Sequence, residues 1–265
     1  MKFPFRLKIF AVLLLLVGCP PSYSQDGPAT GSVEVTGRLK IGTKQEIIVR
    51  KRFYLLRGGL EANKTLIERL KASDVLSRDC FYCQMQVSPE YLAWLKAENC
   101  ESAYCREIKT EDITKIPEFK AAYQKGLTQY GNKPSIAKKW LTTNLETKLR
   151  DGFYEQRKSL IDTLLGGIKP IQSAMTDSVN FKAVFIDIAL QAQTGGKSTE
   201  TFLISNLVPV EIGEKSYIWA CEVEVGSEKT ATLKLQIPEK DKPVKKCEVI
   251  IKDLPDCRVG SCAKK

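Results

Sequence analysis

Hydrophobic residues follow two different periods along the chain, and the period changes twice. From Val33 to Leu55 apolar and polar residues alternate on either side of residues 42–44, which predicts a β-hairpin. Between residues 61 and 167 apolar residues recur every three or four positions, as on one face of a helix. From about Phe181 the alternation returns in five short runs separated by Gly and Pro, which predicts antiparallel strands.

These patterns together predict an α+β protein. A disulfide-stapled helical region lies between an N-terminal β-hairpin and a C-terminal antiparallel β-sandwich, because five strands at roughly ten-residue spacing are typical of sandwiches. The expected segments are a lead and hairpin over 25–60, the helical region over 61–167 and the sandwich-like region over 168–265. The pattern leaves open whether the hairpin joins the C-terminal sheets.

Several local signals fix expected boundaries. Ser88 can cap a helix that Pro89 begins, and Pro117 opens another that ends near Gly131. The apolar stripe from Ile136 to Leu165 predicts one long or broken helix that ends at 166–167, where two glycines follow one another. In the third C-terminal run, one face is expected to hold Tyr217, Trp219, Cys221, Val223 and Val225.

The first 24 residues have the features of an export signal. Lys2, Arg6 and Lys8 precede an apolar run that is too short to cross a bilayer comfortably, since a span needs about 20 residues. The spacing favours cleavage after Ser24. The alternative is a lipobox that ends at Cys19, which would be acylated and would anchor the protein to a membrane. We expect export to the periplasm or the outside of the cell, with no transmembrane span in the mature chain.

Either cleavage leaves an even set of eight cysteines, which in an exported chain indicates disulfides. In the helical region, nested bridges would join Cys80 to Cys105 and Cys83 to Cys100, and a crossed pairing is the alternative. In the C-terminal region the strand pattern predicts that Cys221 and Cys247 face one another on two strands and form a bridge. Cys257 and Cys262 flank a short loop and are expected to form a local bridge.

Other uses of the first four cysteines fit less well. Their spacing would suit a zinc or iron–sulfur site in isolation, but export through the general route into an oxidising compartment disfavours a preloaded metal. The Cys80-x-x-Cys83 spacing matches thiol–disulfide oxidoreductases, although no βαβ pattern surrounds it. We therefore expect structural disulfides, no metal and no cofactor.

The absence of histidine narrows the chemistry further. Without this side chain the chain alone cannot form Ser-His-Asp or Cys-His nucleophilic sites, or metal sites that depend on imidazole. Enzymes that use carboxylates, Lys, Tyr or cysteine redox chemistry remain. For a carboxylate-based glycan hydrolase, the candidate acid pairs are Glu111 with Asp112 and Glu222 with Glu224, and alternation along a strand already explains the second pair.

Charge suggests a different role. The mature chain from Gln25 carries 38 Lys and Arg against 31 Asp and Glu, a net charge of +7. The polar face of the N-terminal hairpin is densely basic, with Arg38, Lys40, Lys44, Arg50, Lys51 and Arg52. A solvated strand face would explain this charge, and the alternative is an anion-binding surface, for which the candidates are Arg38, Lys40, Arg50, Lys51 and Arg52.

The sequence as a whole points to an exported cell-envelope protein that works as a non-enzymatic binding or structural module. Its partner would be an anionic envelope polymer or another protein, and not nucleic acid. No residue stands out as catalytic. The alternative is an enzyme, either a thiol–disulfide oxidoreductase that uses Cys80 and Cys83 or a carboxylate-based glycan hydrolase.

Overall fold

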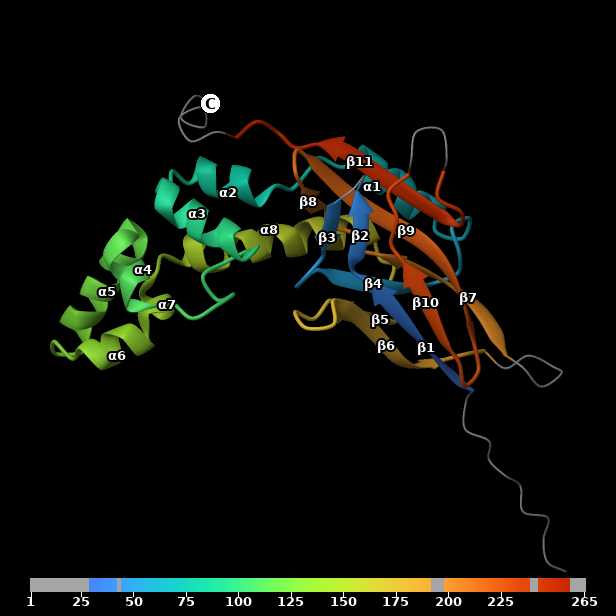
Figure 1. Cartoon of the computed structure of the whole chain (residues 1–265), viewed down its shortest axis with the longest axis horizontal. Helices are drawn as coiled ribbons and strands as arrows, with labels where there is room; N and C mark the ends of the chain where they lie inside the picture. Colours follow the sequence, from blue (N-terminus) through green and yellow to red (C-terminus); the bar gives the residue numbers. More distant parts are fainter. Residues whose placement is uncertain (1–28, 42–43, 192–197, 239–242, 258–265) are drawn as a thin grey trace, which may run out of the picture.

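Strands, then helices, then strands again follow one another along the chain (Figure 1). The computed structural model describes residues 29–41, 44–191, 198–238 and 243–257. The predicted leader, Cys19 and Cys262 lie outside these residues. The prediction of an α+β protein is confirmed as a mixture of helices and strands with several sheets.

The largest sheet has six strands. Five of them follow the spatial order β11, β9, β7, β4, β5, and β8 pairs with β9 outside this order. The pairs between these strands are antiparallel. The strand bounds are β4 Arg52–Arg57, β5 Gln172–Met175, β7 Thr199–Ser205, β8 Val210–Ile212, β9 Lys215–Gly226 and β11 Cys247–Asp253.

Two smaller sheets accompany it. A three-stranded sheet has the order β10, β1, β6, with bounds β1 Thr30–Thr36, β6 Lys182–Ala189 and β10 Thr230–Lys234. β1 runs antiparallel to β6 but parallel to β10, and this parallel register places Thr36 opposite Lys234. A two-stranded sheet joins β2 (Arg38–Ile41) to β3 (Lys44–Ile47).

The N-terminal segment does not form one continuous hairpin, so that prediction is wrong in its extent. β2 pairs with β3, whereas β1 lies in the three-stranded sheet and β4 in the six-stranded sheet. β1 lies between β10 and β6, and β4 lies between β7 and β5, so each has two neighbouring strands where a hairpin would give it one, and Val33, Val35, Phe53 and Leu55 are fully buried. β1 and β4 therefore join the C-terminal strands in the two larger sheets, and the helices are inserted between β4 and β5.

The two larger sheets contribute to one hydrophobic core. Val33 of β1 and Phe185 of β6 belong to it, together with Phe53 of β4, Phe202 of β7 and Trp219 of β9. The face predicted for residues 217–225 is confirmed, since Tyr217, Trp219, Cys221, Val223 and Val225 all lie in this core. Burial of each large apolar side chain contributes roughly 1.5–3 kcal/mol, so this strand holds the two sheets together.

The other face of the six-stranded sheet packs against two helices. Ile218 and Ala220 of β9 share a separate apolar cluster with residues from the two helices α1 (Lys64–Ala72) and α8 (Thr147–Leu165), among them Leu66, Leu70 and Leu164. β9 is therefore buried on both faces near its start, which explains why its sequence is almost continuously apolar there.

The remaining helices form a region with a core of its own (Figure 1). Tyr82, Tyr91, Trp94 and Phe119 meet in it through edge-to-face ring contacts, and the Phe153 ring stacks on Tyr82. Helix α8 connects the two parts, because Phe153 lies in this core and Leu164 lies against the sheet. The bounds are α2 Arg78–Gln84, α3 Pro89–Ala97, α4 Thr110–Lys115, α5 Pro117–Gln129, α6 Pro134–Lys139 and α7 Leu141–Asn144.

The helix start and stop signals are confirmed. The Ser88 hydroxyl accepts a hydrogen bond from the Tyr91 N–H at 3.1 Å, with Pro89 as the first residue of α3. Pro117 opens α5, and Gly166 ends α8 in the left-handed conformation at φ 54°. The predicted long helix is broken into α6, α7 and α8, because Leu145 between the last two is extended at ψ 153°. None of the described helices has both the length and the apolarity that a membrane crossing requires.

The disulfides connect different cysteines from those predicted in the helical region. The bridges are Cys80–Cys257, Cys100–Cys105 and Cys221–Cys247, and Cys83 is disulfide-bonded as well. The Cys221–Cys247 prediction is confirmed by the register of β9 and β11, in which these residues are directly opposite. Both the nested and the crossed pairing are wrong, as is a local Cys257–Cys262 bridge, because the chain after β11 runs back to α2 and brings Cys257 to Cys80.

Candidate functional site

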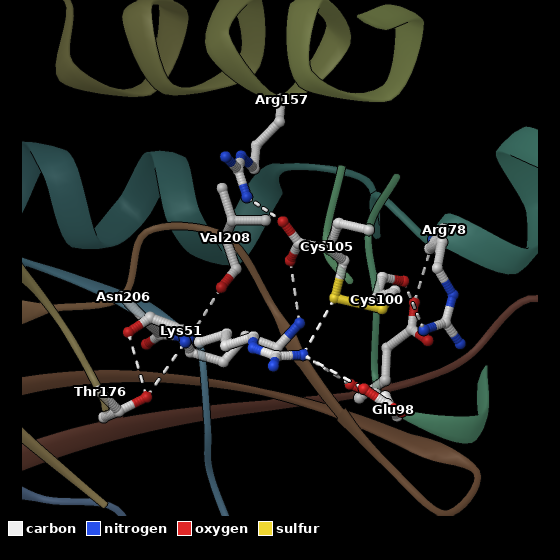
Figure 2. A network of polar contacts seen from close by, with 12 residues as sticks. Lys51, Arg78, Glu98, Cys100, Cys105, Arg157, Thr176, Asn206 and Val208 are labelled. Carbon is white, nitrogen blue, oxygen red and sulfur yellow. Dashed lines mark hydrogen bonds and ion pairs between the residues drawn. A yellow bond between two sulfur atoms is a disulfide. The ribbon is translucent and has the colours of Figure 1, made fainter. Parts of the chain in front are cut away.

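A buried carboxylate lies where the strands meet the helical region. Glu101 belongs to the loop that the Cys100–Cys105 disulfide closes, and its side chain is only 14% exposed. The Lys51 ammonium lies 2.9 Å from Glu101 Oε1, and the Arg157 guanidinium donates to Oε2. Figure 2 shows Arg157 reaching down from α8 while Lys51 approaches from the strand side. Three distant parts of the chain therefore meet at one carboxylate.

The charge state of Glu101 follows from these neighbours. Burial alone raises the pKa of a carboxyl group, but the nearby Lys51 and Arg157 cations outweigh it and hold the pKa of Glu101 below its usual range. Glu101 is consequently ionised at neutral pH. A general acid in a glycan hydrolase needs the opposite shift, so this carboxylate fits a structural role better than an acid–base role.

Arginines hold the same loop from two sides. Arg50 Nη1 donates to Cys105 Sγ at 3.0 Å and lies 4.0 Å from the Glu98 carboxylate. Arg78 Nη1 donates to the Cys100 carbonyl at 3.1 Å (Figure 2). We call this set the junction: Arg50, Lys51, Arg78, Glu98, Cys100, Glu101, Cys105 and Arg157. The charged side chains of the junction form ion pairs and hydrogen bonds within it, and these contacts attach the helical region to the sheets.

Backbone contacts continue the junction into the six-stranded sheet. The Lys51 N–H donates to Thr176 Oγ1 at 3.1 Å, which ties the segment before β4 to the segment after β5. Nearby, the buried Asn206 side chain donates to the Val208 carbonyl at 2.7 Å and accepts from the Trp219 N–H at 2.8 Å. The junction is thus rigidly supported from the strand side (Figure 2).

The cysteine pair proposed for redox chemistry is not paired with itself. Cys80 is bonded to Cys257, and both Cys80, in the first turn of α2, and Cys83, near its end, are buried. A thiol–disulfide oxidoreductase of the Cys-x-x-Cys type relies on a bridge between the two cysteines of its motif, at an accessible position. The structure shows neither feature here.

The acids proposed for glycan hydrolysis are also engaged separately. Asp112 Oδ2 accepts from the Lys109 N–H at 2.9 Å, Glu222 Oε2 accepts from the Leu60 N–H at 3.2 Å, and Glu224 pairs with the Lys246 ammonium. These contacts do not place two carboxylates across a common cleft. Within the described part of the chain, three or more Cys, Asp or Glu side chains do not gather closely enough to hold a metal ion.

The basic residues predicted as one anion-binding face divide into three groups. Arg50 and Lys51 belong to the junction, and Arg52 donates to Ser173 Oγ at 3.0 Å on the neighbouring strand β5. Arg38 and Lys40 lie apart from them on β2, where Leu39 between them is buried and both basic side chains are exposed. The break comes at residues 48–51, where the chain leaves β3 and crosses to the other sheet.

Arg38 and Lys40 line a groove of about 1050 Å³ together with two lysines from the C-terminal part, Lys234 and Lys245. No Asp or Glu lies among the described residues that line it, and these four cations form no ion pair within the described chain. The Arg38 guanidinium lies 4.6 Å above the Phe181 ring, which holds it in place without neutralising it. We call this surface the basic groove. Its full lining is Thr36, Arg38, Lys40, Ile41, Lys234, Leu235, Gln236, Ile237, Pro238, Pro243, Val244 and Lys245.

The sequence carries no signal that joins Lys234 and Lys245 to the basic groove. Lys234 comes to Arg38 because β1 and β10 pair in parallel with Thr36 opposite Lys234, a register between segments almost two hundred residues apart. Comparison of the chain with protein-family models, with curated proteins and with solved structures found no match. Arguments about function therefore rest on the geometry of these surfaces.

Proposed function

We propose that the protein is an exported, non-enzymatic binding module of the cell envelope, and that its basic groove binds an anionic envelope polymer. The observation that carries this proposal is the set of four cations, Arg38, Lys40, Lys234 and Lys245, which share one groove without an acidic neighbour in its described lining. Unpaired charge of one sign in a concave surface raises the local concentration of oppositely charged ligand.

A polymer suits this groove better than a single small anion. The four side chains are exposed, and each contact of an exposed charge with an anion contributes little, typically below about 1 kcal/mol. A chain of repeated carboxylates or phosphates can meet several of these cations at once, so the contacts add up. Such binding must weaken steeply with salt, because exposed charges are screened over about 10 Å at 0.1 M ionic strength.

The export part of the proposal rests on the leader and on the disulfides. Bridges such as Cys80–Cys257 and Cys221–Cys247 persist in oxidising compartments. The mature protein is expected to begin at Gln25, in the periplasm or outside the cell, with its two larger sheets arranged as a β-sandwich. Intact mass of the exported protein tests the cleavage, and an acylated Cys19 at the N-terminus would favour the membrane-anchored lipoprotein instead.

Binding at the groove is tested with matched charge variants. One variant replaces Arg38, Lys40, Lys234 and Lys245 by Gln. Its control replaces four exposed lysines of the helical region that form no ion pair in the described chain, namely Lys64, Lys120, Lys125 and Lys148, so both variants lose the same charge. The probes are immobilised polygalacturonate and immobilised poly(glycerol phosphate), which present carboxylates and phosphates respectively.

We expect the groove variant to elute at much lower salt than the parent, and the control to elute close to the parent. Thermal unfolding of both variants should match the parent, because substitutions of exposed lysines typically change stability by no more than about 0.5 kcal/mol. Equal loss of retention in the two variants would mean that net charge alone causes binding, and the proposal would be wrong.

A further inference from the structure

A second hollow, of about 560 Å³, lies in the helical region beside the loop that the Cys100–Cys105 disulfide closes. It is formed between the loop that follows Cys100 and the helices α6 and α7. Its lining is Ala103, Tyr104, Arg106, Glu107, Ile108, Ser135, Lys138, Lys139, Leu141 and Thr142. The volume falls within the range of small-ligand pockets, roughly 300–1,000 Å³.

The hollow has an apolar floor and a polar rim. Ala103, Ile108 and Leu141 are buried and form the apolar part of the lining. The rim carries the hydroxyls of Ser135 and Thr142 and the ammonium groups of Lys138 and Lys139. An apolar part of the lining with a small number of polar groups that fix the orientation of the ligand is the usual composition of a small-ligand site.

Tyr104 presents an aromatic ring at this hollow and is 52% exposed. Its position is fixed by the loop: the Tyr104 N–H donates to Ser102 Oγ at 3.2 Å, and the Cys100–Cys105 bridge closes the loop around it. Glu101 in the same loop is held by Lys51 and Arg157. The backbone at Tyr104 is held in this way, and its ring has only two side-chain torsions to restrict when a ligand stacks on it, so it can serve as a platform at a low cost in conformational freedom.

The cations at the rim differ in the contacts that they make within the protein. Arg106 lies 3.6 Å from Glu98, 3.5 Å from Asp112 and 4.2 Å above the Trp94 ring. Its charge is therefore already paired within the protein. Among the described residues, Lys138 has a hydrogen bond to the Thr110 hydroxyl at 3.5 Å, and the Lys139 ammonium lies 5.9 Å above the Trp140 ring. Neither lysine forms an ion pair with an acid of the described chain. Two cations are therefore free for a ligand anion, against the single rim acid Glu107.

We propose that this hollow binds one unit of an acidic saccharide. The apolar face of the sugar ring stacks on Tyr104, its carboxylate lies near Lys138 and Lys139, and its hydroxyls reach Ser135 and Thr142. A platform, hydroxyls and free cations in one hollow match a ring that has an apolar face, several hydroxyls and one negative charge. The site is separate from the basic groove and does not depend on polymer binding there.

Binding is measured by calorimetry with trigalacturonate, and with maltotriose as the neutral probe of equal length. We expect trigalacturonate to bind and maltotriose to bind at least about tenfold more weakly, since the ammonium contacts need a carboxylate. Tyr104→Ala should weaken trigalacturonate binding about tenfold, and Tyr104→Phe should retain it, because stacking needs the ring and not the hydroxyl.

Replacement of Lys138 and Lys139 by Gln should weaken binding to a similar extent and flatten its salt dependence. The control replaces Lys64 and Lys148, which lie outside the hollow, and should bind like the parent. The four-residue groove variant should keep the part of trigalacturonate binding that Tyr104→Ala removes, which separates the two sites. The proposal is overturned if trigalacturonate does not bind at millimolar concentration, if maltotriose binds as tightly, or if folded Tyr104→Ala binds unchanged.

Discussion

Basic residues from one short stretch of sequence have opposite roles in the junction and in the basic groove. Arg38 and Lys40 are exposed in the groove without an acidic partner among the described residues, whereas Arg50 and Lys51, about ten residues later, contact Glu98, Glu101 and the Cys100–Cys105 bridge. In the sequence the two pairs look alike. What distinguishes them is that the inserted helical region supplies carboxylates to Arg50 and Lys51, whereas no described residue supplies one to Arg38 or Lys40.

The two regions also differ in solvent exposure, which decides what a charge can do. The Lys51 and Glu101 side chains are 13% and 14% exposed, so their attraction is weakly screened and losing one partner leaves the other buried. In the groove the cations remain hydrated and contribute little to folding, but they are free to meet a ligand. Changes in the junction are therefore expected to alter stability, and changes in the groove to alter binding. Single-residue variants in each region test this expectation.

The largest effect is expected from Glu101→Gln. This change removes the charge that Lys51 and Arg157 share, and breaking a buried ion pair by removing one partner typically costs about 3–5 kcal/mol. The free energy of unfolding, measured in urea, should fall by about 3 kcal/mol. Glu98→Gln is the matched control, since its side chain is 48% exposed and lies 4.0 Å from Arg50. It should lose less than about 1 kcal/mol, and equal losses would contradict a special role for Glu101.

A smaller loss is expected when one cation of the junction is removed. Lys51→Met leaves Arg157 on Glu101, so the carboxylate is only partly deprived of its partners and the loss should be about 2 kcal/mol. Lys40→Met, in the groove, should change stability by less than about 0.5 kcal/mol. Urea unfolding of the two variants compares the regions directly. Similar losses would show that the groove lysine is also structural.

Acid should weaken the junction and leave the groove unchanged. The folded-state pKa of Glu101 is depressed, so the stability it contributes is fully present above its unfolded pKa, about 4.3. That stability is lost as the pH falls through the lower, folded pKa. The gap in unfolding free energy between the parent and Glu101→Gln should therefore be constant near neutral pH and shrink below about pH 4. A gap that persists unchanged at low pH would show that charge is not what Glu101 contributes.

Much of the fold was predictable because it depends on local pattern. Ser88, Pro117 and Gly166 mark helix ends through their own capping and backbone preferences, and alternation identified the buried face of β9. The Cys221–Cys247 bridge was predictable for the same reason, since both cysteines begin runs of alternating residues.

The parts that could not be predicted depend on contacts between distant segments. Cys80 and Cys257 are separated by 177 residues, and no spacing rule joins them. The parallel pairing of β1 with β10, which brings Lys234 to Arg38, is set by packing of the sheets and not by either strand alone. The same holds for Glu101, which resembles any other acid in the sequence until Lys51 and Arg157 approach it.

The smallest effect is expected at Arg52, which lies in neither region. Its side chain is exposed and donates to Ser173 Oγ at 3.0 Å, without an acidic partner in the described chain. Arg52→Ser should change the free energy of unfolding by no more than about 0.5 kcal/mol, because a single exposed hydrogen bond is readily replaced by water. Retention on polygalacturonate should also stay close to that of the parent, whereas Lys40→Ser should reduce it. Both changes remove one positive charge from an exposed strand residue, so the comparison tests chiefly the position of that charge. A loss of retention at Arg52 as large as that at Lys40 would show that the binding surface extends past β3 and that the groove is not its boundary.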